Sequence, residues 1–191
     1  KPFRAGVKEI LENLFENKDI SYDETQKQAI EMALLNNIAI ITGGPGTGKT
    51  TIVRAILEGL RELKLSFVLA APTGRAAKRL EESSGVDAAT LHRLLSLRPS
   101  DDDDNFIMDV EDIDADVVIV DEMSMVDINL YQKLLESMGD DTSLIMVGDA
   151  DQLPSVGPGN VLKDLLRVDE MPKVKLETIH RTVDTSEIAV V

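Results

Sequence analysis

The stretch that decides the fold is Ile38-Ala39-Ile40-Ile41-Thr42-Gly43-Gly44-Pro45-Gly46-Thr47-Gly48-Lys49-Thr50. Its first four residues form a short continuous apolar run, which is typical of a parallel strand buried on both faces. Residues 43–50 match the pattern G-x-x-x-x-G-K-[ST], and apolar residues at helical spacing follow them. A strand, a glycine-rich loop and a helix in this order predict a phosphate-binding loop.

The chemistry predicted for this loop is the binding of ATP with Mg²⁺. Glycines let the backbone wrap closely around a phosphate, and the N–H groups at the helix N-terminus then point at it. In this pattern Lys49 reaches the β- and γ-phosphates, and the Thr50 hydroxyl binds Mg²⁺. A chance glycine-rich turn is the alternative, but it would match in a chain of this length only on the order of 1% of the time. The predicted nucleotide contacts here are Gly43, Gly44, Pro45, Gly46, Thr47, Gly48, Lys49, Thr50 and Thr51.

Further apolar runs follow the loop and predict an α/β fold. Strands are expected at residues 67–70, 117–120, 144–147 and 174–176, with helices near residues 52–60, 74–82, 91–95, 129–137 and 161–166. Alternating strands and helices imply a mainly parallel, doubly wound sheet with helices on both faces. In such sheets ligands bind at the carboxyl ends of the strands, and the polar motifs of this chain follow predicted strands.

Two acidic residues, Asp121 and Glu122, directly follow the predicted strand at residues 117–120. A carboxylate at the end of a strand beside a phosphate loop is placed to hold Mg²⁺, usually through water, which is the role predicted for Asp121. The neighbouring Glu122 is predicted to be the general base that polarises the attacking water. The alternative is a pair of solvated acids after a strand.

A second polar segment, Gly148-Asp149-Ala150-Asp151-Gln152-Leu153-Pro154, follows the strand at residues 144–147. Because that strand is expected beside the nucleotide, the Gln152 amide could detect the γ-phosphate. On spacing alone, an ordinary Asp-rich turn explains the segment equally well.

Composition narrows the possible functions. The 191-residue chain has no cysteine and two histidines, which excludes disulfides and thiolate metal sites and argues against zinc. No apolar run approaches the ~20 residues that cross a membrane. The first residues, Lys1-Pro2-Phe3-Arg4, include neither an initiator methionine nor an apolar signal core, so we expect the chain to start inside a longer protein.

Charge is distributed very unevenly. The net charge of −15 argues against a nucleic-acid partner, but nine acidic residues are concentrated at residues 101–116. Residues 71–98 instead carry Arg75, Lys78, Arg79, Arg93 and Arg98, so any DNA-facing surface is predicted in that stretch. Residues 101–105 are expected to form a solvated loop, because they lack the spacing of a calcium-binding loop.

The order of the motifs resembles superfamily 1 helicases. It comprises Gln26, the loop at residues 43–50, Ala71-Pro72-Thr73-Gly74-Arg75, Thr90-Leu91-His92, Asp121-Glu122-Met123-Ser124 and the segment from Gly148 to Leu162. Residues 153–162 and the tail Leu176-Glu177-Thr178-Ile179-His180-Arg181 resemble the RecD branch. The resemblance covers about residues 21–191 and implies a RecA-like ATP-binding motor domain there. Residues 1–20 are expected to be the helical tail of a preceding domain.

The resemblance also implies roles for individual residues. Gln26 matches the glutamine that recognises adenine, and Gln152 and Arg181 match residues that contact the γ-phosphate. Catalysis would then involve Lys49, Glu122, Gln152 and Arg181. Residues implied to touch single-stranded DNA are Pro72, Thr73, Gly74, Arg75, Thr90 and His92, although helix capping or partial burial explains His92 equally well.

For the whole protein, the resemblance implies a cytoplasmic ATP-dependent DNA helicase that acts in recombination and repair. It would move 5′-to-3′ on single-stranded DNA, with ATP held between this domain and a second RecA-like domain. A stand-alone helicase and a subunit with RecB- and RecC-like partners both fit. The alternatives are another P-loop ATPase of the AAA+ type, or a nucleotide-binding module without turnover, which is the expectation for the isolated chain because an arginine finger would be missing.

Overall fold

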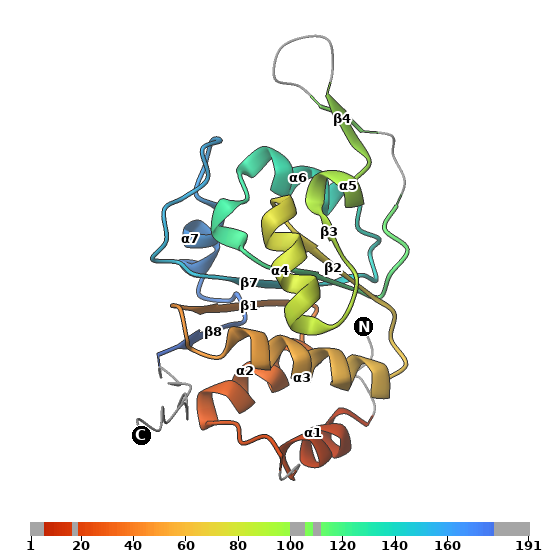
Figure 1. Cartoon of the computed structure of the whole chain (residues 1–191), viewed down its shortest axis with the longest axis vertical. Helices are drawn as coiled ribbons and strands as arrows, with labels where there is room; N and C mark the ends of the chain where they lie inside the picture. Colours follow the sequence, from red (N-terminus) through yellow and green to blue (C-terminus); the bar gives the residue numbers. More distant parts are fainter. Residues whose placement is uncertain (1–5, 17–18, 100–105, 109–111, 178–191) are drawn as a thin grey trace, which may run out of the picture.

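The computed structural model describes residues 6–16, 19–99, 106–108 and 112–177 (Figure 1). Within these residues, the central sheet has six parallel strands in the order β3-β2-β6-β7-β1-β8. The strands are β1 (Ile38–Gly43), β2 (Phe67–Ala71), β3 (Ala88–Thr90), β6 (Val117–Val120), β7 (Ser143–Gly148) and β8 (Lys173–Leu176). The helices are α1 (Val7–Glu16), α2 (Glu24–Leu35), α3 (Lys49–Glu62), α4 (Gly74–Ser84), α5 (Leu91–Leu94), α6 (Ile128–Glu136) and α7 (Val161–Leu166), with a 3-10 turn η1 (Met123–Met125). The predicted doubly wound α/β fold is confirmed.

The central strands are apolar throughout because both faces of the sheet are covered. Every residue of β6 and β7 is buried, as is β1 after Ile38. A strand with only one covered face would instead alternate apolar and polar residues. The continuous runs at residues 38–41, 117–120 and 144–147 therefore predicted these strands correctly.

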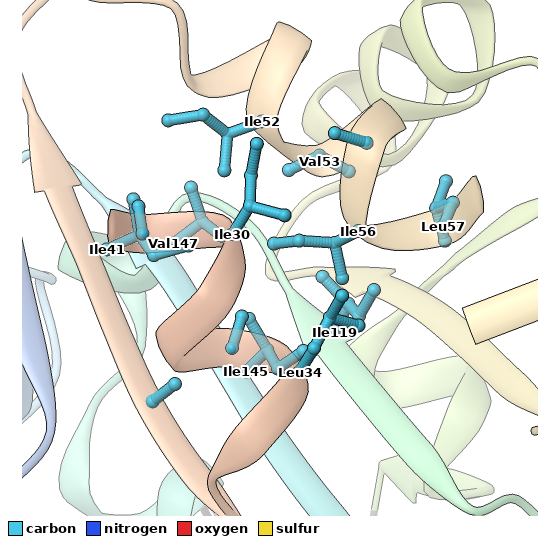
Figure 2. Close-up of a cluster of buried hydrophobic side chains, with 14 of the residues drawn as sticks. Ile30, Leu34, Ile41, Ile52, Val53, Ile56, Leu57, Ile119, Ile145 and Val147 are labelled. Atoms are coloured by element: carbon cyan, nitrogen blue, oxygen red, sulfur yellow. The ribbon is translucent and has the colours of Figure 1, made fainter. Parts of the chain in front are cut away.

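One core lies between the sheet and helices α1, α2 and α3. Figure 2 shows Ile30 and Leu34 of α2 near Ile52 and Ile56 of α3, clustered with strand residues that point to the same face of the sheet. Those strand residues are Ile41, Ile119, Ile145 and Val147. Each fully buried aliphatic side chain contributes about 1.5–3 kcal/mol, so this core holds the helix that follows the glycine-rich loop firmly against β1.

The second core fills the opposite face. The alternate residues of the same strands point there, including Ile40, Val118 and Met146, and they meet side chains from α5, α6 and α7. Those helix residues are Leu91, Leu130, Leu134, Val161 and Leu162. Helices thus cover both faces of the sheet and leave the strand ends to carry polar segments (Figure 1).

Some elements were not predicted from the sequence. Strand β3 has only three half-buried residues, Ala-Ala-Thr, which give no apolar run. Strands β4 (Leu97–Pro99) and β5 (Phe106–Met108) form an antiparallel pair that projects from the domain (Figure 1). The expected solvated loop at residues 101–105 lies outside the described residues. In contrast, the short strand expected at residues 174–176 is present as β8, which pairs with β1.

Helix α1 packs onto the same core as α2 and α3 through the buried residues Val7 and Leu11. The boundary predicted near residue 20, with a preceding domain before it, stays a prediction. Among the helices of the described ranges, none combines the length and apolarity needed to cross a membrane.

Candidate nucleotide site at the carboxyl edge of the sheet

Five polar segments leave the sheet at the same edge, because all six strands of the described sheet are parallel. Residues 43–50 follow β1 and residues 148–152 follow its neighbour β7. Asp121 and Glu122 follow β6, residues 72–75 follow β2, and residues 90–92 lie at the end of β3. The predicted nucleotide residues therefore lie around β1, β7 and β6, and the predicted DNA-contacting residues lie around β2 and β3.

The glycine-rich loop has the backbone geometry of a phosphate cradle. Gly46 and Gly48 have positive φ angles of 75° and 88°, which favour glycine. Gly48 caps α3 without any side-chain hydrogen bond, so the first N–H groups of the helix are available to an anion. Lys49 Nζ donates hydrogen bonds to the carbonyl oxygens of Gly43, at 2.6 Å, and Gly44, at 2.9 Å. The ammonium is thus folded over the loop where a phosphate would lie.

Packing around the start of the loop leaves no room for a side chain at Gly43. A Cβ atom there would lie 2.5 Å from Thr47 Oγ1 and 2.9 Å from Leu176 Cβ of the adjacent strand β8. Thr47 is buried, and its hydroxyl donates to the Gly44 carbonyl oxygen at 2.7 Å. Thr50 and Thr51 occupy the first turn of α3, where Thr50 is exposed and Thr51 is half-buried.

Asp121 directly follows β6, and the positive charge of Lys49 is close enough to act on its carboxyl group. Burial raises the pKa of its carboxyl above the usual 3.8, a nearby negative charge on Glu122 adds to the increase, and Lys49 and Arg79 oppose it. Asp121 Oδ1 also accepts a hydrogen bond from the Glu122 N–H at 2.8 Å, which lowers the pKa. A half-buried carboxylate whose charged form is disfavoured by desolvation is suited to a cation brought in with a substrate.

Glu122 itself has a left-handed backbone conformation, with φ 53° and ψ 42°. This conformation costs a non-glycine residue on the order of 1–3 kcal/mol and turns the chain sharply into η1. The strained turn at a predicted catalytic residue could not be foreseen, because nothing in Asp-Glu-Met-Ser marks it.

The segment after β7 is tied directly to β1. The Ala150 N–H donates to Thr42 Oγ1 at 3.1 Å, and Thr42 is the last residue before the glycine-rich loop. Asp149 is buried, and its Oδ1 accepts from the Asp151 N–H at 3.0 Å. Thr42 was missed as a site residue, although a hydroxyl at the end of an apolar strand was a usable signal.

Gln152 is exposed and lines a groove of about 700 Å³. The groove continues along the loop that follows, where Leu153 is 87% exposed and Val156 is fully exposed. Gly157 of this loop packs against Asp127, which caps helix α6 by accepting a hydrogen bond from the Leu130 N–H at 2.8 Å. The loop is therefore anchored near both ends while its apolar tip faces solvent.

The predicted DNA-contacting threonines have local structural uses. Thr73 is the N-cap of α4 and accepts from the Ala76 N–H at 3.2 Å, and Thr90 caps α5 by accepting from Arg93 at 3.1 Å. Gly74 and Arg75 are exposed, while Pro72 and His92 are half-buried. The capping threonines fix where α4 and α5 begin, so they position these exposed groups at the edge of the sheet.

Gln26 also has a local use. It is 3% exposed, and its Oε1 accepts a hydrogen bond from the Asp23 N–H at 3.0 Å. Asp23 in turn accepts from the Gln26 N–H at 2.8 Å, which completes a capping box at the start of α2. The remaining predicted catalytic residue, Arg181, lies outside the described residues.

The side chains near the glycine-rich loop fit a magnesium ion that takes some of its ligands from the protein and the others from substrate phosphates. Within the described ranges, no group of three or more His, Asp or Glu residues could hold a metal. Mg²⁺ prefers oxygen ligands and commonly uses one or two protein groups together with substrate phosphates. The Thr50 hydroxyl, in the first turn of α3, and the Asp121 carboxylate, directly after β6, are oxygen donors of the kind that such an ion would need.

Comparison with known proteins agrees with this geometry. A family model described as an AAA domain matches residues 26–158. The RecBCD enzyme subunit RecD of Mycolicibacterium smegmatis is 38% identical over 182 residues, covering 83% of this chain and 33% of that protein. The ATP-dependent RecD2 DNA helicase of Deinococcus radiodurans is 37% identical over 158 residues, covering 83% of this chain and 21% of that protein. The chain thus spans about a third or less of the length of these curated relatives.

Solved structures with a similar fold include Pif1 helicases. Pif1 from a Bacteroides species, in complex with ADP-AlF4, has a TM-score of 0.59 at 22% identity, covering 86% of this chain and 44% of that chain. Pif1 helicase from Candida albicans has a TM-score of 0.60 at 23% identity, covering 84% and 41%. At these identities the likeness shows the fold alone.

Proposed function

Because this chain belongs to the AAA domain family and is a RecD-like member of it, we propose that it is the ATP-binding motor domain of a 5′-to-3′ DNA helicase. The observation that carries the proposal is the glycine-rich loop at residues 43–50, with the Lys49 ammonium folded over it. The segment with Gln152 follows β7, which is the neighbour of β1, and Asp121 follows β6, which is the next strand in the sheet. The alternative of another type of P-loop ATPase is not favoured, because the curated relatives described above are named as RecD proteins.

In this proposal the chain's own residues bind and orient ATP. The N–H groups of the loop hold the phosphates, and Lys49 exchanges its two carbonyl partners for phosphate oxygens. Gln26 contacts adenine, Thr51 lies beside the phosphates in the first turn of α3, and Gln152 and Arg181 contact the γ-phosphate. Mg²⁺, held by Thr50 and Asp121, would neutralise phosphate charge when bound.

The chemical step is an attack of water on the γ-phosphorus. The bond between the γ-phosphorus and the bridging oxygen breaks as the new phosphorus–oxygen bond forms, and Glu122 accepts the proton of the water. In this proposal, the left-handed backbone turn at Glu122, directly after β6, would set the direction of this carboxylate. Residues of the second RecA-like domain would complete the charge stabilisation.

The proposed DNA-contacting groups are Pro72, Thr73, Gly74 and Arg75 after β2, and Thr90 and His92 at β3. These segments lie along the same edge of the sheet as the nucleotide segments, and β2 is the neighbour of β6. The partners in this proposal are single-stranded DNA, a second RecA-like domain of the same protein and, in a nuclease complex, RecB- and RecC-like subunits. A cytoplasmic location is part of the proposal.

The decisive experiment is the Lys49→Ala variant of the full-length protein. ATP affinity should fall about 10- to 100-fold, since hydrogen bonds to a charged group contribute about 1.5–3 kcal/mol, and DNA-stimulated hydrolysis should be lost. The measurements are binding of a fluorescent ATP analogue and phosphate release with and without single-stranded DNA. Lys163→Ala, at an exposed lysine of α7, is the matched control. Unchanged DNA-stimulated hydrolysis in Lys49→Ala would overturn the proposal.

A further inference from the structure

Ser124 has a buried hydroxyl that no group in the described part of the chain satisfies. Its side chain is 7% exposed, and among the described residues its Oγ is the buried side-chain oxygen or nitrogen that lacks a hydrogen-bond partner. Buried polar groups in native proteins are nearly always paired, so an exception beside a candidate site calls for an explanation. None of the roles proposed above uses this hydroxyl.

The position of Ser124 joins two parts of the nucleotide site. Ser124 lies in η1, which starts immediately after the left-handed residue Glu122. The η1 turn rests directly on the end of β7, because a Cβ atom on Gly148 would come within 3.1 Å of Met123 N. β7 continues into the segment that carries Gln152. Ser124 is therefore placed where the general base and the γ-phosphate contact could be held relative to each other.

Asp149, in the segment that follows β7, is a hydrogen-bond acceptor that can take a further donor. Asp149 follows Gly148 directly and is 6% exposed. Its Oδ1 accepts from the Asp151 N–H at 3.0 Å, and its backbone carbonyl accepts from the Gln152 N–H at 3.2 Å. A carboxylate can accept about four hydrogen bonds, so Asp149 can take a further donor. The two adjoining turns thus carry a buried donor without a partner and a buried acceptor able to receive it.

We propose that Ser124 is a positioning residue whose hydroxyl donates a hydrogen bond to the Asp149 carboxylate when nucleotide occupies the site. This bond would join the turn of Glu122 to the segment of Gln152, so that the general base and the γ-phosphate contact are aligned together. The inference rests on the proposed function, because it gives the site a device that responds to ATP. Ser124 acts through Glu122 and Gln152 and contacts no substrate.

The test compares Ser124→Ala with wild type in the full-length protein. The kcat of DNA-stimulated ATP hydrolysis should fall about tenfold, while the Kd of a fluorescent ATP analogue should change less than twofold. The melting temperature without nucleotide should stay the same or rise, since the variant removes an unsatisfied hydroxyl. A merely structural serine would instead lower the melting temperature and leave kcat unchanged. Ser83→Ala, at a serine whose hydroxyl donates to Leu80 in α4, is the matched control.

A double-mutant cycle with Asp149→Asn identifies the partner. If the two groups act as one unit, the double variant should lose no more kcat than the more affected single variant. Additive losses, or a kcat of Ser124→Ala within twofold of wild type, would overturn the inference. The Lys49→Ala variant separates this failure from that of the proposed function: full activity in Ser124→Ala with none in Lys49→Ala overturns only the role of Ser124.

Discussion

At the scale of single residues, Gly43 and Gly44 form a natural pair for comparison. A Cβ atom at Gly43 would meet Thr47 Oγ1 and Leu176 Cβ within 3 Å, whereas nothing lies within 4 Å of one at Gly44. We expect Gly43→Ala to lower the free energy of unfolding by about 1–3 kcal/mol through overpacking, and Gly44→Ala to change it little. Urea denaturation without nucleotide measures both. Equal stability of the two variants would show that the loop absorbs the methyl group.

We expect Asp121 to make the stability of the fold depend on pH with the sign opposite to that of a typical carboxylate. Its pKa is raised above 3.8 chiefly by burial, so the folded protein binds more protons than the unfolded chain just above that pH. Stability should therefore fall as pH rises through this window. Each tenfold increase in proton affinity corresponds to about 1.4 kcal/mol.

In Asp121→Asn we expect that pH slope to be absent and the free protein to be more stable at neutral pH, although hydrolysis is lost. Denaturation between about pH 3.5 and 7, with a chelator present, measures this. Asp114→Asn, at an exposed carboxylate, controls for the loss of one charge. An unchanged slope in Asp121→Asn would assign the dependence to another group.

At the scale of elements, helix α2 combines a capping residue with a proposed adenine contact. Gln26→Glu keeps an oxygen to accept the Asp23 N–H, as in other capping boxes, but loses the amide donors. We expect it to remain about as stable as wild type but to bind ATP more weakly and to lose preference for ATP over GTP. Gln26→Ala should in addition lose about 1 kcal/mol of stability. If both variants bound ATP and GTP like wild type, Gln26 would have only the capping role.

At the scale of the whole molecule, the predicted nucleotide residues that the structure describes belong to one sheet and its helices. The chain covers 33% or less of the relatives described above and has a net charge of −15. We expect the isolated chain to bind ATP but to hydrolyse it about 10³-fold or more slowly than the full-length protein, since a missing arginine finger costs that much. Phosphate release with and without single-stranded DNA measures this, and ATP-induced thermal stabilisation shows that the chain is folded. Stimulated turnover within tenfold of the full-length protein would contradict the expectation.

Sequence patterns predicted the elements whose structure depends mainly on one property of their own residues, either burial on both faces or the backbone freedom of glycine. Strands β1, β6 and β7 are buried on both faces, so their apolar runs are unmistakable, and the loop at residues 43–50 follows from glycine geometry. Strand β3 could not be predicted because its residues are small and its position depends on pairing with β2. The η1 turn that follows Glu122 packs against Gly148 of β7, and no local pattern encodes such a contact between segments distant in the sequence.

The hydrogen bonds that Lys49 makes to its own loop have a consequence for the energetics of nucleotide binding in the proposed function. Two carbonyl oxygens of the loop already surround its ammonium, so an arriving phosphate replaces existing ligands of the amine. In the proposed function, the affinity for ATP is then the difference between two sets of bonds, so product should be released more easily than the number of contacts suggests. The same two hydrogen bonds tie the lysine to the backbone of its own loop, which would keep the loop in shape from one turnover to the next.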